Sequence, residues 1–313
     1  MSDKRATREA FGATLVELAT EGRDDIVALD ADLAMSTTTS KFAAAFPDRF
    51  FEMGIAEQNM IATAAGLAVG GKTPFTGSFA VFGTGRVYDQ IRNSVCYAAL
   101  SVKICPTHAG ITVGPDGGTH QMLEDIALMR VLPNMRVMVP ADFAAARAAI
   151  RIAADTPGPV YVRLGRAAVS AVYEDGSAFE LGTARVLRSG GDITLVACGV
   201  MVERALAAAE DLAAEGVSAE VIDMFSVKPL DVDVLLDSAR RTGAVVTCEE
   251  HSVIGGLGSA VAETLGEGAP VPMERVGVRD AFGTSGEPEE LMERFGLTAP
   301  HIVAAARRVL QRL

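Results

Sequence analysis

A glutamate and two histidines stand where an α/β chain could use them for proton transfer. Glu57 follows a short strand-like run, Phe50–Met53, and lies near the start of a segment with helical periodicity. His108 and His120 flank a glycine-rich stretch at 110–118, which also follows a strand-like run. In open α/β sheets, ligands bind at the carboxyl ends of strands. Because histidine titrates near neutral pH, we expect these imidazoles to exchange protons with a substrate.

Each of these residues also has an ordinary structural explanation. A carboxylate in the first turn of a helix complements the helix dipole, so Glu57 could serve only as a cap. Phe79 and Phe82 could be core residues, and a histidine beside a glycine-rich turn is often simply hydrogen-bonded there. Residue types and positions alone leave these alternatives open.

The local sequences around these residues resemble one enzyme family. Gly54–Met60 reads Gly-Ile-Ala-Glu-Gln-Asn-Met, and Gly114–Gln121 reads Gly-Pro-Asp-Gly-Gly-Thr-His-Gln. Both are similar to the pyrimidine-binding half of transketolases, which use thiamine diphosphate, and deoxyxylulose phosphate synthases share the first motif. The resemblance implies that Glu57 hydrogen-bonds the aminopyrimidine ring of the cofactor and thereby helps to activate its thiazolium carbon.

The same resemblance implies a pocket for the aminopyrimidine ring. Phe82 would stack on the ring with Phe79 as its neighbour, and Asp32 would lie near the cofactor. Gly85 stands where many transketolases carry another aromatic residue, so we expect the pocket to be more open on that side. Asp32 could equally cap a helix that starts near Thr38.

Further matches imply a substrate site. His120 would donate or accept protons at the carbonyl and hydroxyls of a sugar, and Asp116 would bind a sugar hydroxyl. A lone surface arginine is usually just solvated, but the family's cluster for the substrate phosphate is matched at several positions, which together suit a phosphate monoester. These positions are Arg8, Ser36, His108 and Arg166.

One part of a complete thiamine diphosphate enzyme is not found in this sequence. The family holds the diphosphate through a divalent metal bound by a Gly-Asp-Gly segment and a later Asn, whereas Pro115–Gly117 and Gly191–Ile193 each lack one of the glycines. The resemblance thus covers two of the three domains of a transketolase. We expect no metal site here, and an obligate N-terminal partner subunit that carries the diphosphate with Mg²⁺ or Ca²⁺, in two copies of each chain.

The resemblance favours the C-terminal subunit of a split transketolase, which would transfer a two-carbon ketol group from a ketose phosphate to an aldose phosphate. A 1-deoxyxylulose phosphate synthase or a 2-oxoacid dehydrogenase beta subunit would share Glu57 and the fold. The run from His108 to His120 favours sugar chemistry over the dehydrogenase, and His108 favours transketolase over the synthase. An inactive structural partner that kept the fold is the alternative from outside the enzymes.

Composition limits the classes of partner. The 313 residues carry a formal net charge of -12, which argues against nucleic acid because phosphate neutralisation needs clustered Lys and Arg. No apolar run approaches the about 18 residues of a membrane helix, and the N-terminus lacks the apolar core of a signal peptide. The four cysteines lack the spacing of a disulfide or zinc framework, so we expect buried thiols in a soluble, cytoplasmic protein.

Two α/β domains with parallel sheets are expected to position these residues, because strand-like runs alternate with helical patterns. Turn signals place a linker at 171–190, between a pyrimidine-binding domain at 1–170 and a C-terminal domain at 191–313. One expected helix, at 56–69, begins beside Glu57. The expected strands are 26–29, 50–53, 102–105, 137–139, 160–164, 193–197, 219–222, 245–248 and one near Val276.

Two motifs of the second half have weaker functional interpretations. Gly255–Ala260 is glycine-rich and follows a strand, but it lacks the third glycine of a dinucleotide loop, so nucleotide binding is disfavoured. For Glu249–His251, the resemblance implies packing and dimerisation rather than chemistry.

Overall fold

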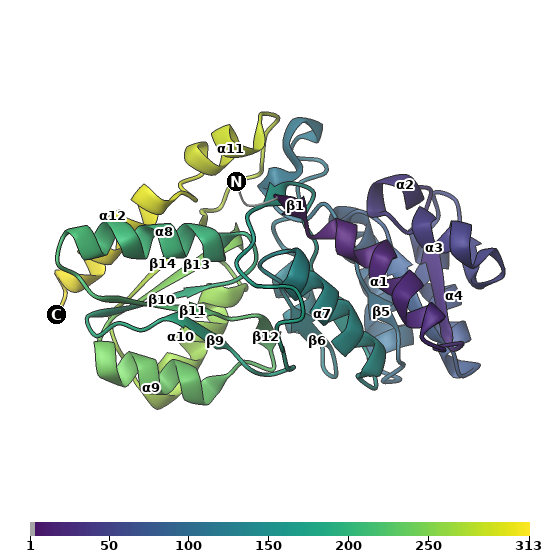
Figure 1. Cartoon of the computed structure of the whole chain (residues 1–313), viewed down its shortest axis with the longest axis horizontal. Helices are drawn as coiled ribbons and strands as arrows, with labels where there is room; N and C mark the ends of the chain where they lie inside the picture. Colours follow the sequence, from purple (N-terminus) through teal and green to yellow (C-terminus); the bar gives the residue numbers. More distant parts are fainter. Residues whose placement is uncertain (1–3) are drawn as a thin grey trace.

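The computed structural model describes residues 4–313, which form two α/β lobes lying side by side (Figure 1). Each lobe has a central sheet covered by helices, so the expected α/β class is confirmed. The first three residues of the predicted pyrimidine-binding domain lie outside this description. No helix within 4–313 is long and apolar enough to cross a bilayer.

The sheet of the first lobe has seven strands among the described residues, in the order β12-β6-β7-β5-β4-β2-β3, and only β12 runs antiparallel to its neighbour. Asp30, at the end of β2, lies opposite Glu52 of β3 and Gly77 of β4. The carboxyl ends of these strands therefore meet at one edge. The strands are β2 (Ile26–Asp30), β3 (Phe50–Glu52), β4 (Thr73–Gly77), β5 (Lys103–Ile104), β6 (Arg136–Met138), β7 (Val160–Val162) and β12 (Ser226–Lys228).

Helices cover this sheet because their apolar residues recur on one face. In α1, Phe11, Leu15 and Leu18 are buried, as their spacing predicts. α7 begins after Asp142, whose side chain accepts a hydrogen bond from the Ala145 N–H at 2.8 Å. The helical segments include α1 (Arg8–Thr20), α2 (Ala34–Thr37), α3 (Ser40–Ala45), α4 (Glu57–Val69), α5 (Tyr88–Gln90), α6 (Asp125–Arg130), α7 (Phe143–Asp155) and the π-helical turns η2 (Val81–Gly85) and η3 (Ile91–Cys96).

The second lobe is built around a five-stranded sheet in the order β14-β13-β10-β11-β9, counted over residues 4–313. All five residues of β10 are buried, as a strand covered on both faces requires. The elements are β9 (Arg185–Arg188), β10 (Ile193–Ala197), β11 (Ala219–Asp223), β13 (Val245–Ser252), β14 (Met273–Val278), α8 (Met201–Ala214), α9 (Val232–Thr242), α10 (Leu257–Gly268), α11 (Pro288–Arg294) and α12 (Ala299–Leu310).

Several strands were not expected from the sequence, among them β4, β9 and β12. β9 lies within the predicted linker and pairs antiparallel with β11. β12 follows β11 in the chain but crosses to the first sheet, where Ser226 lies opposite Met138 of β6. A three-residue strand followed by Pro229 is too short to show an alternating pattern. The second half of the chain therefore contributes a strand to the first sheet.

The four cysteines are buried and form no disulfide, which confirms the prediction of buried thiols. Burial raises the pKa of Cys96 to about 11, so this thiol is protonated at neutral pH and a poor nucleophile.

A buried ionic network joins the two lobes. Arg163, next to the end of β7, donates through Nε to Asp125 Oδ2 at 2.7 Å and through Nη2 to the Glu250 carbonyl in β13 at 2.9 Å. Tyr161 donates to the same Asp125 oxygen at 2.6 Å. Although burial opposes ionisation, the Arg163 guanidinium holds the pKa of Asp125 below its ordinary value. Asp125 is thus a buried charge that depends on its cation.

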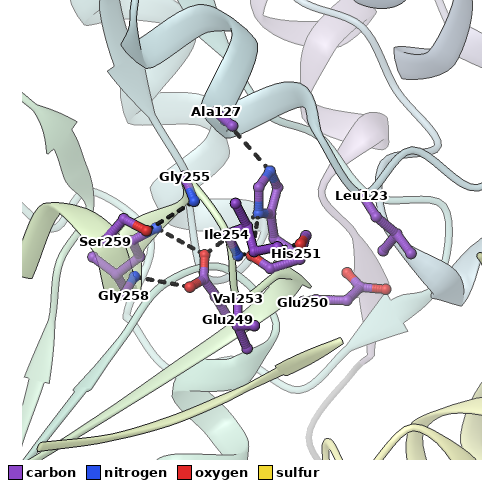
Figure 2. Close-up of polar contacts among 12 residues, drawn as sticks. Leu123, Ala127, Glu249, Glu250, His251, Val253, Ile254, Gly255, Gly258 and Ser259 are labelled. Carbon is purple, nitrogen blue, oxygen red and sulfur yellow. Dashed lines mark hydrogen bonds and ion pairs between the residues drawn. The ribbon is translucent and has the colours of Figure 1, made fainter. Parts of the chain in front are cut away.

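Figure 2 shows the second-lobe side of this junction, Glu249–His251. Glu249 accepts hydrogen bonds from the first backbone N–H groups of α10 at 2.7 and 2.8 Å. His251 Nε2 lies 3.4 Å from the Ala127 N–H of α6, in the other lobe. The expected packing role is confirmed within the chain, whereas a role in dimerisation stays a prediction.

Removing the Arg163 cation should leave Asp125 charged and unpaired in the interior. We expect Arg163→Met to lower the free energy of unfolding by about 3–5 kcal/mol. Urea denaturation, monitored by circular dichroism, measures the decrease in the free energy of unfolding. Arg240→Met is the matched control, because the Arg240–Asp237 pair, at 3.4 Å, is exposed and should contribute little. Equal losses in the two variants would contradict this role of the network.

Candidate active site

Glu57 is the first residue of α4 and only 3% exposed. The chain reaches it through a tight turn in which Gly54 has a φ of 68° and the Ala56 N–H donates to the Gly54 carbonyl at 2.7 Å. Glu57 Oε1 accepts a hydrogen bond from Arg86 Nη1 at 2.8 Å. The site therefore contains a buried carboxyl group that is paired with the Arg86 guanidinium.

Arg86 connects Glu57 to an aromatic wall. Its guanidinium carbon lies 4.3 Å from the centroid of the Phe82 ring, and its side chain is 45% exposed. Residues four apart on a helical turn are neighbours, which brings Phe82 and Arg86 together. Arg86 is absent from the residues predicted for the site, and its spacing from Phe82 is the sequence signal that points to it.

A groove of about 540 Å³ lies against Phe82 and Arg86. Gly85 and Met122 also line it. A Cβ atom at Gly85 would have only the Met122 methyl group within contact range, at 3.9 Å. The groove is thus open at Gly85, as expected from the missing aromatic residue.

The predicted aromatic residues and histidines pack together. Phe79 stacks on His108 with ring centroids 3.8 Å apart and planes inclined by 24°. Phe79 and Phe82 are nearly parallel, with centroids 6.2 Å apart. His120 meets Phe82 edge-on at 5.4 Å. These four rings form one continuous set of contacts between the groove and the glycine-rich loop, although Phe79 and His108 are themselves buried.

Three residues of the predicted phosphate cluster are in direct contact. Arg8 Nη1 donates to the Ser36 carbonyl at 2.8 Å and lies 3.4 Å from His108 Nε2. Burial, together with the nearby Arg166 guanidinium, lowers the pKa of Arg8. Arg8 Nε is buried and has no hydrogen-bond partner among the described residues. An unsatisfied donor on a buried cation suits an anionic ligand.

His108 differs from the expected proton shuttle. Burial, followed by the charges of Arg8 and Arg166, lowers the pKa of His108 to about 3. Since Arg8 can only donate, Nε2 accepts and Nδ1 carries the proton, which it donates to the Thr107 hydroxyl at 2.7 Å. The expectation of a near-neutral pKa is therefore wrong for His108, because two guanidinium groups surround a buried ring.

Asp116 and Arg166 approach each other less closely. Asp116 Oδ1 and Arg166 Nη1 are 3.9 Å apart, and both side chains are about one third exposed, at 37% and 36%. Arg166 also donates to the Val113 carbonyl in η4 (Ile111–Asp116). The two predicted substrate residues thus lie on the rim, where their charges face solvent.

Gln121 fixes the glycine-rich loop. Its Nε2 donates to the carbonyls of Ile111 and Gly114, each at 3.2 Å, and to that of Thr284 in the second half of the chain at 2.9 Å. A Cβ atom on Gly118 would lie 2.6 Å from another carbonyl oxygen of that half. Close packing against residues distant in sequence explains why this loop contains glycine.

Asp32 does not contact the rings or the cation cluster through any hydrogen bond found within residues 4–313. It is exposed with a φ of 62°, and its N–H donates to Glu52 Oε1 at 2.7 Å. The same Glu52 oxygen accepts from the Gly54 N–H at 3.0 Å, which ties the Asp32 loop to the turn before Glu57. The alternative that Asp32 caps a helix is wrong, because neither α2 nor α3 has a side-chain cap.

The buried carboxyl group of this loop belongs to Asp30. Its oxygens accept hydrogen bonds from the hydroxyls of Thr37 at 2.7 Å and Thr39 at 2.8 Å, and from the Leu33 N–H at 2.8 Å. Burial raises the pKa of Asp30 to about 6 despite these bonds. Asp30 thus shapes the segment that carries Ser36.

Two family descriptions match this chain. "Transketolase, pyrimidine binding domain" matches residues 3–171, and "Transketolase, C-terminal domain" matches residues 182–302. The chain belongs to the transketolase family.

Several transketolase relatives are similar over nearly their whole length. The 6-deoxy-6-sulfo-D-fructose transketolase subunit SqwH of Clostridium sp. (strain MSTE9) is 50% identical over 305 residues, 97% of this chain and 94% of the relative. An apulose-4-phosphate transketolase subunit of Phocaeicola vulgatus is 41% identical over 302 residues, 96% of each. A solved structure described as "Split gene transketolase, inactive beta4 tetramer" is 55% identical, with a TM-score of 0.91 over 99% of both chains.

In this transketolase chain, the predicted site residues fall into two groups joined by stacked rings. Glu57 and Phe82 form the first group through Arg86. Arg8 and His108 belong to the second, and Phe79 bridges the two groups.

The raised pKa of Asp30 predicts a pH-dependent stability. The folded state binds the Asp30 proton more tightly than the unfolded state, so this contribution is complete below the ordinary pKa of 3.8 and is lost as pH rises through about 6. We expect wild type to lose about 3 kcal/mol relative to Asp30→Asn between about pH 4 and pH 7. Denaturant unfolding of both proteins across this range measures the difference, and parallel curves would contradict the assignment.

Proposed function

We propose that this chain is the C-terminal subunit of a two-chain transketolase, which transfers a two-carbon ketol group from a ketose phosphate to an aldose phosphate with thiamine diphosphate. The observation that carries the proposal is the buried Glu57 at the start of α4, joined through Arg86 to the groove beside Phe82. A carboxyl group, a flat apolar wall and an adjoining cation cluster suit an aminopyrimidine ring next to an acidic sugar.

The residues present fit the aminopyrimidine end of the cofactor. The groove of about 540 Å³ is of the size that small ligands occupy. Phe82 would offer a stacking face supported by Phe79, Glu57 would hydrogen-bond a ring nitrogen in place of Arg86, and Asp32 would lie nearby. When bound, thiamine diphosphate would supply the thiazolium carbon that accepts the two-carbon unit.

The cation cluster fits the acidic end of the sugar. Arg8 has an unsatisfied buried donor, His108 is neutral and accepts hydrogen bonds, and Arg166 faces solvent at the rim. His120 would exchange protons with the substrate carbonyl and hydroxyls, and Asp116 would bind a hydroxyl. The names of the two relatives contain one sulfonated sugar and one sugar phosphate. Phosphate is the acid group we propose, with sulfonate as the alternative.

The proposed partner is an N-terminal transketolase subunit that holds the diphosphate with Mg²⁺ or Ca²⁺, in two copies of each chain. Met35 and Ile55, next to Ser36 and close to Glu57, are 83% and 77% exposed. Large apolar side chains exposed beside a site are typical of a surface that another chain covers. A cytoplasmic location and the lack of nucleic acid and membrane partners stay predictions.

We expect the isolated chain and the two-chain complex to differ in catalytic activity. The similar solved structure is described as an inactive beta4 tetramer. We therefore expect activity only from the two-chain complex. The run from His108 to His120 favours a sugar substrate over the 2-oxoacid alternative.

Glu57→Gln should abolish cofactor activation in the complex. We expect kcat for ketol transfer from xylulose 5-phosphate to ribose 5-phosphate to fall by at least about 100-fold, because the amide cannot exchange a proton with the ring. The assay uses this chain mixed with its N-terminal partner, thiamine diphosphate and Mg²⁺. Glu263→Gln is the control, because its exposed carboxylate pairs with Arg130, outside the candidate site. Unchanged activity of a stable Glu57→Gln complex would support the inactive structural partner instead.

Arg166→Ala should weaken the binding of phosphorylated substrates. We expect KM for ribose 5-phosphate to rise by about 10–100-fold, because a charge-assisted hydrogen bond contributes about 1.5–3 kcal/mol. KM for unphosphorylated ribose should not change. Steady-state kinetics with both sugars tests this, and equal losses for both would show that Arg166 does not bind the acid group.

A further inference from the structure

A second cation cluster lies in the other lobe, between β14, α11 and α12 (Figure 1). It surrounds a hollow of about 390 Å³, which we call the arginine pocket. The residues that supply its cationic or titratable side chains are Arg275, Arg279, Arg294, His301 and Arg308, and no Asp or Glu lines it. None of these residues belongs to the candidate active site.

Most of these guanidinium groups lack a carboxylate partner. Within residues 4–313, Arg275, Arg279 and Arg294 form no ion pair, although Arg275 donates to the Val253 carbonyl at 2.8 Å and Arg279 donates to the Arg275 carbonyl at 2.9 Å. Arg308 lies 3.3 Å from Glu274, which it shares with another arginine. The charge around the hollow is therefore only partly compensated.

Arg307 shows how different the pocket is from the neighbouring surface. This residue adjoins Arg308 on α12, yet its guanidinium is paired with both carboxylate oxygens of Glu215. The chain as a whole has an excess of acidic residues, with 40 Asp and Glu against 28 Lys and Arg. Carboxylates are thus plentiful, and yet three neighbouring arginines have none. Like charges held together repel each other, and an anion between them relieves that repulsion.

We propose that the arginine pocket binds a soluble small molecule with a phosphate or diphosphate group. Guanidinium groups recognise phosphate oxygens through paired hydrogen bonds, and several around one hollow contact different oxygens of the same group. Phe295 lines the same hollow and provides an apolar face for the rest of the molecule. The volume is within the range of sites for small ligands.

Inorganic pyrophosphate is a suitable probe, and calorimetric titration of the full-length chain measures its binding. All proteins carry Arg166→Ala, so that the proposed substrate site contributes little, and ionic strength is held constant with KCl. Arg279→Gln combined with Arg294→Gln removes two unpaired cations of the pocket. Arg307→Gln is the matched control, because it removes one cation from the same lobe outside the pocket.

We expect the Arg279→Gln/Arg294→Gln protein to bind pyrophosphate at least 10-fold more weakly than its parent, and the Arg307→Gln protein to bind it equally well. The single variant Arg294→Gln, whose side chain is exposed on the last turn of α11, should show a smaller loss and serves if the double variant misfolds. Absence of pyrophosphate binding in the Arg166→Ala parent, or equal weakening by Arg307→Gln, would overturn the proposal.

Discussion

The buried Arg163 guanidinium is the interaction on which the arrangement of the two lobes depends. It neutralises Asp125 in its own lobe and binds the backbone of Glu250 in the other. Separating the lobes would break the hydrogen bond from Arg163 to the Glu250 carbonyl, a bond from a charged donor of the kind that contributes about 1.5–3 kcal/mol. The network therefore fixes the positions of β7, α6 and β13 relative to one another.

Residues of the second lobe also hold the glycine-rich loop of the site in place. The Glu250 carboxylate accepts a hydrogen bond from the Thr112 N–H at 2.7 Å, and a Cβ atom on Gly110 would collide with that carboxylate at 2.1 Å. Gln121 reaches Thr284 from the same loop. The glycine-rich loop thus belongs to the first lobe by sequence, but the second lobe sets its position.

Sequence patterns predicted the helices and strands better than they predicted contacts between residues distant in the chain. The burial of Phe11 and Leu15 and the start of α4 at Glu57 follow from helical spacing over a few residues. β12 and the pKa of His108 depend on groups far away in the chain, and neither periodicity nor motif spacing contains that information. The family resemblance named residues of the site, but it did not predict that Arg86 would pair with Glu57 or that Asp30, rather than Asp32, would be the buried carboxyl group.

The crossing of β12 determines how this chain can be divided. A fragment that ended at residue 170 would lack the strand that covers β6, and the uncovered edge would present unpaired backbone groups to other molecules. A fragment that began at residue 191 would carry Ser226–Lys228 without the sheet that receives it. Neither half therefore has a complete sheet without the other. Recombination that exchanges one half between relatives must preserve the pairing of β12 with β6. A second chain that binds across the two lobes would meet them as one preassembled surface.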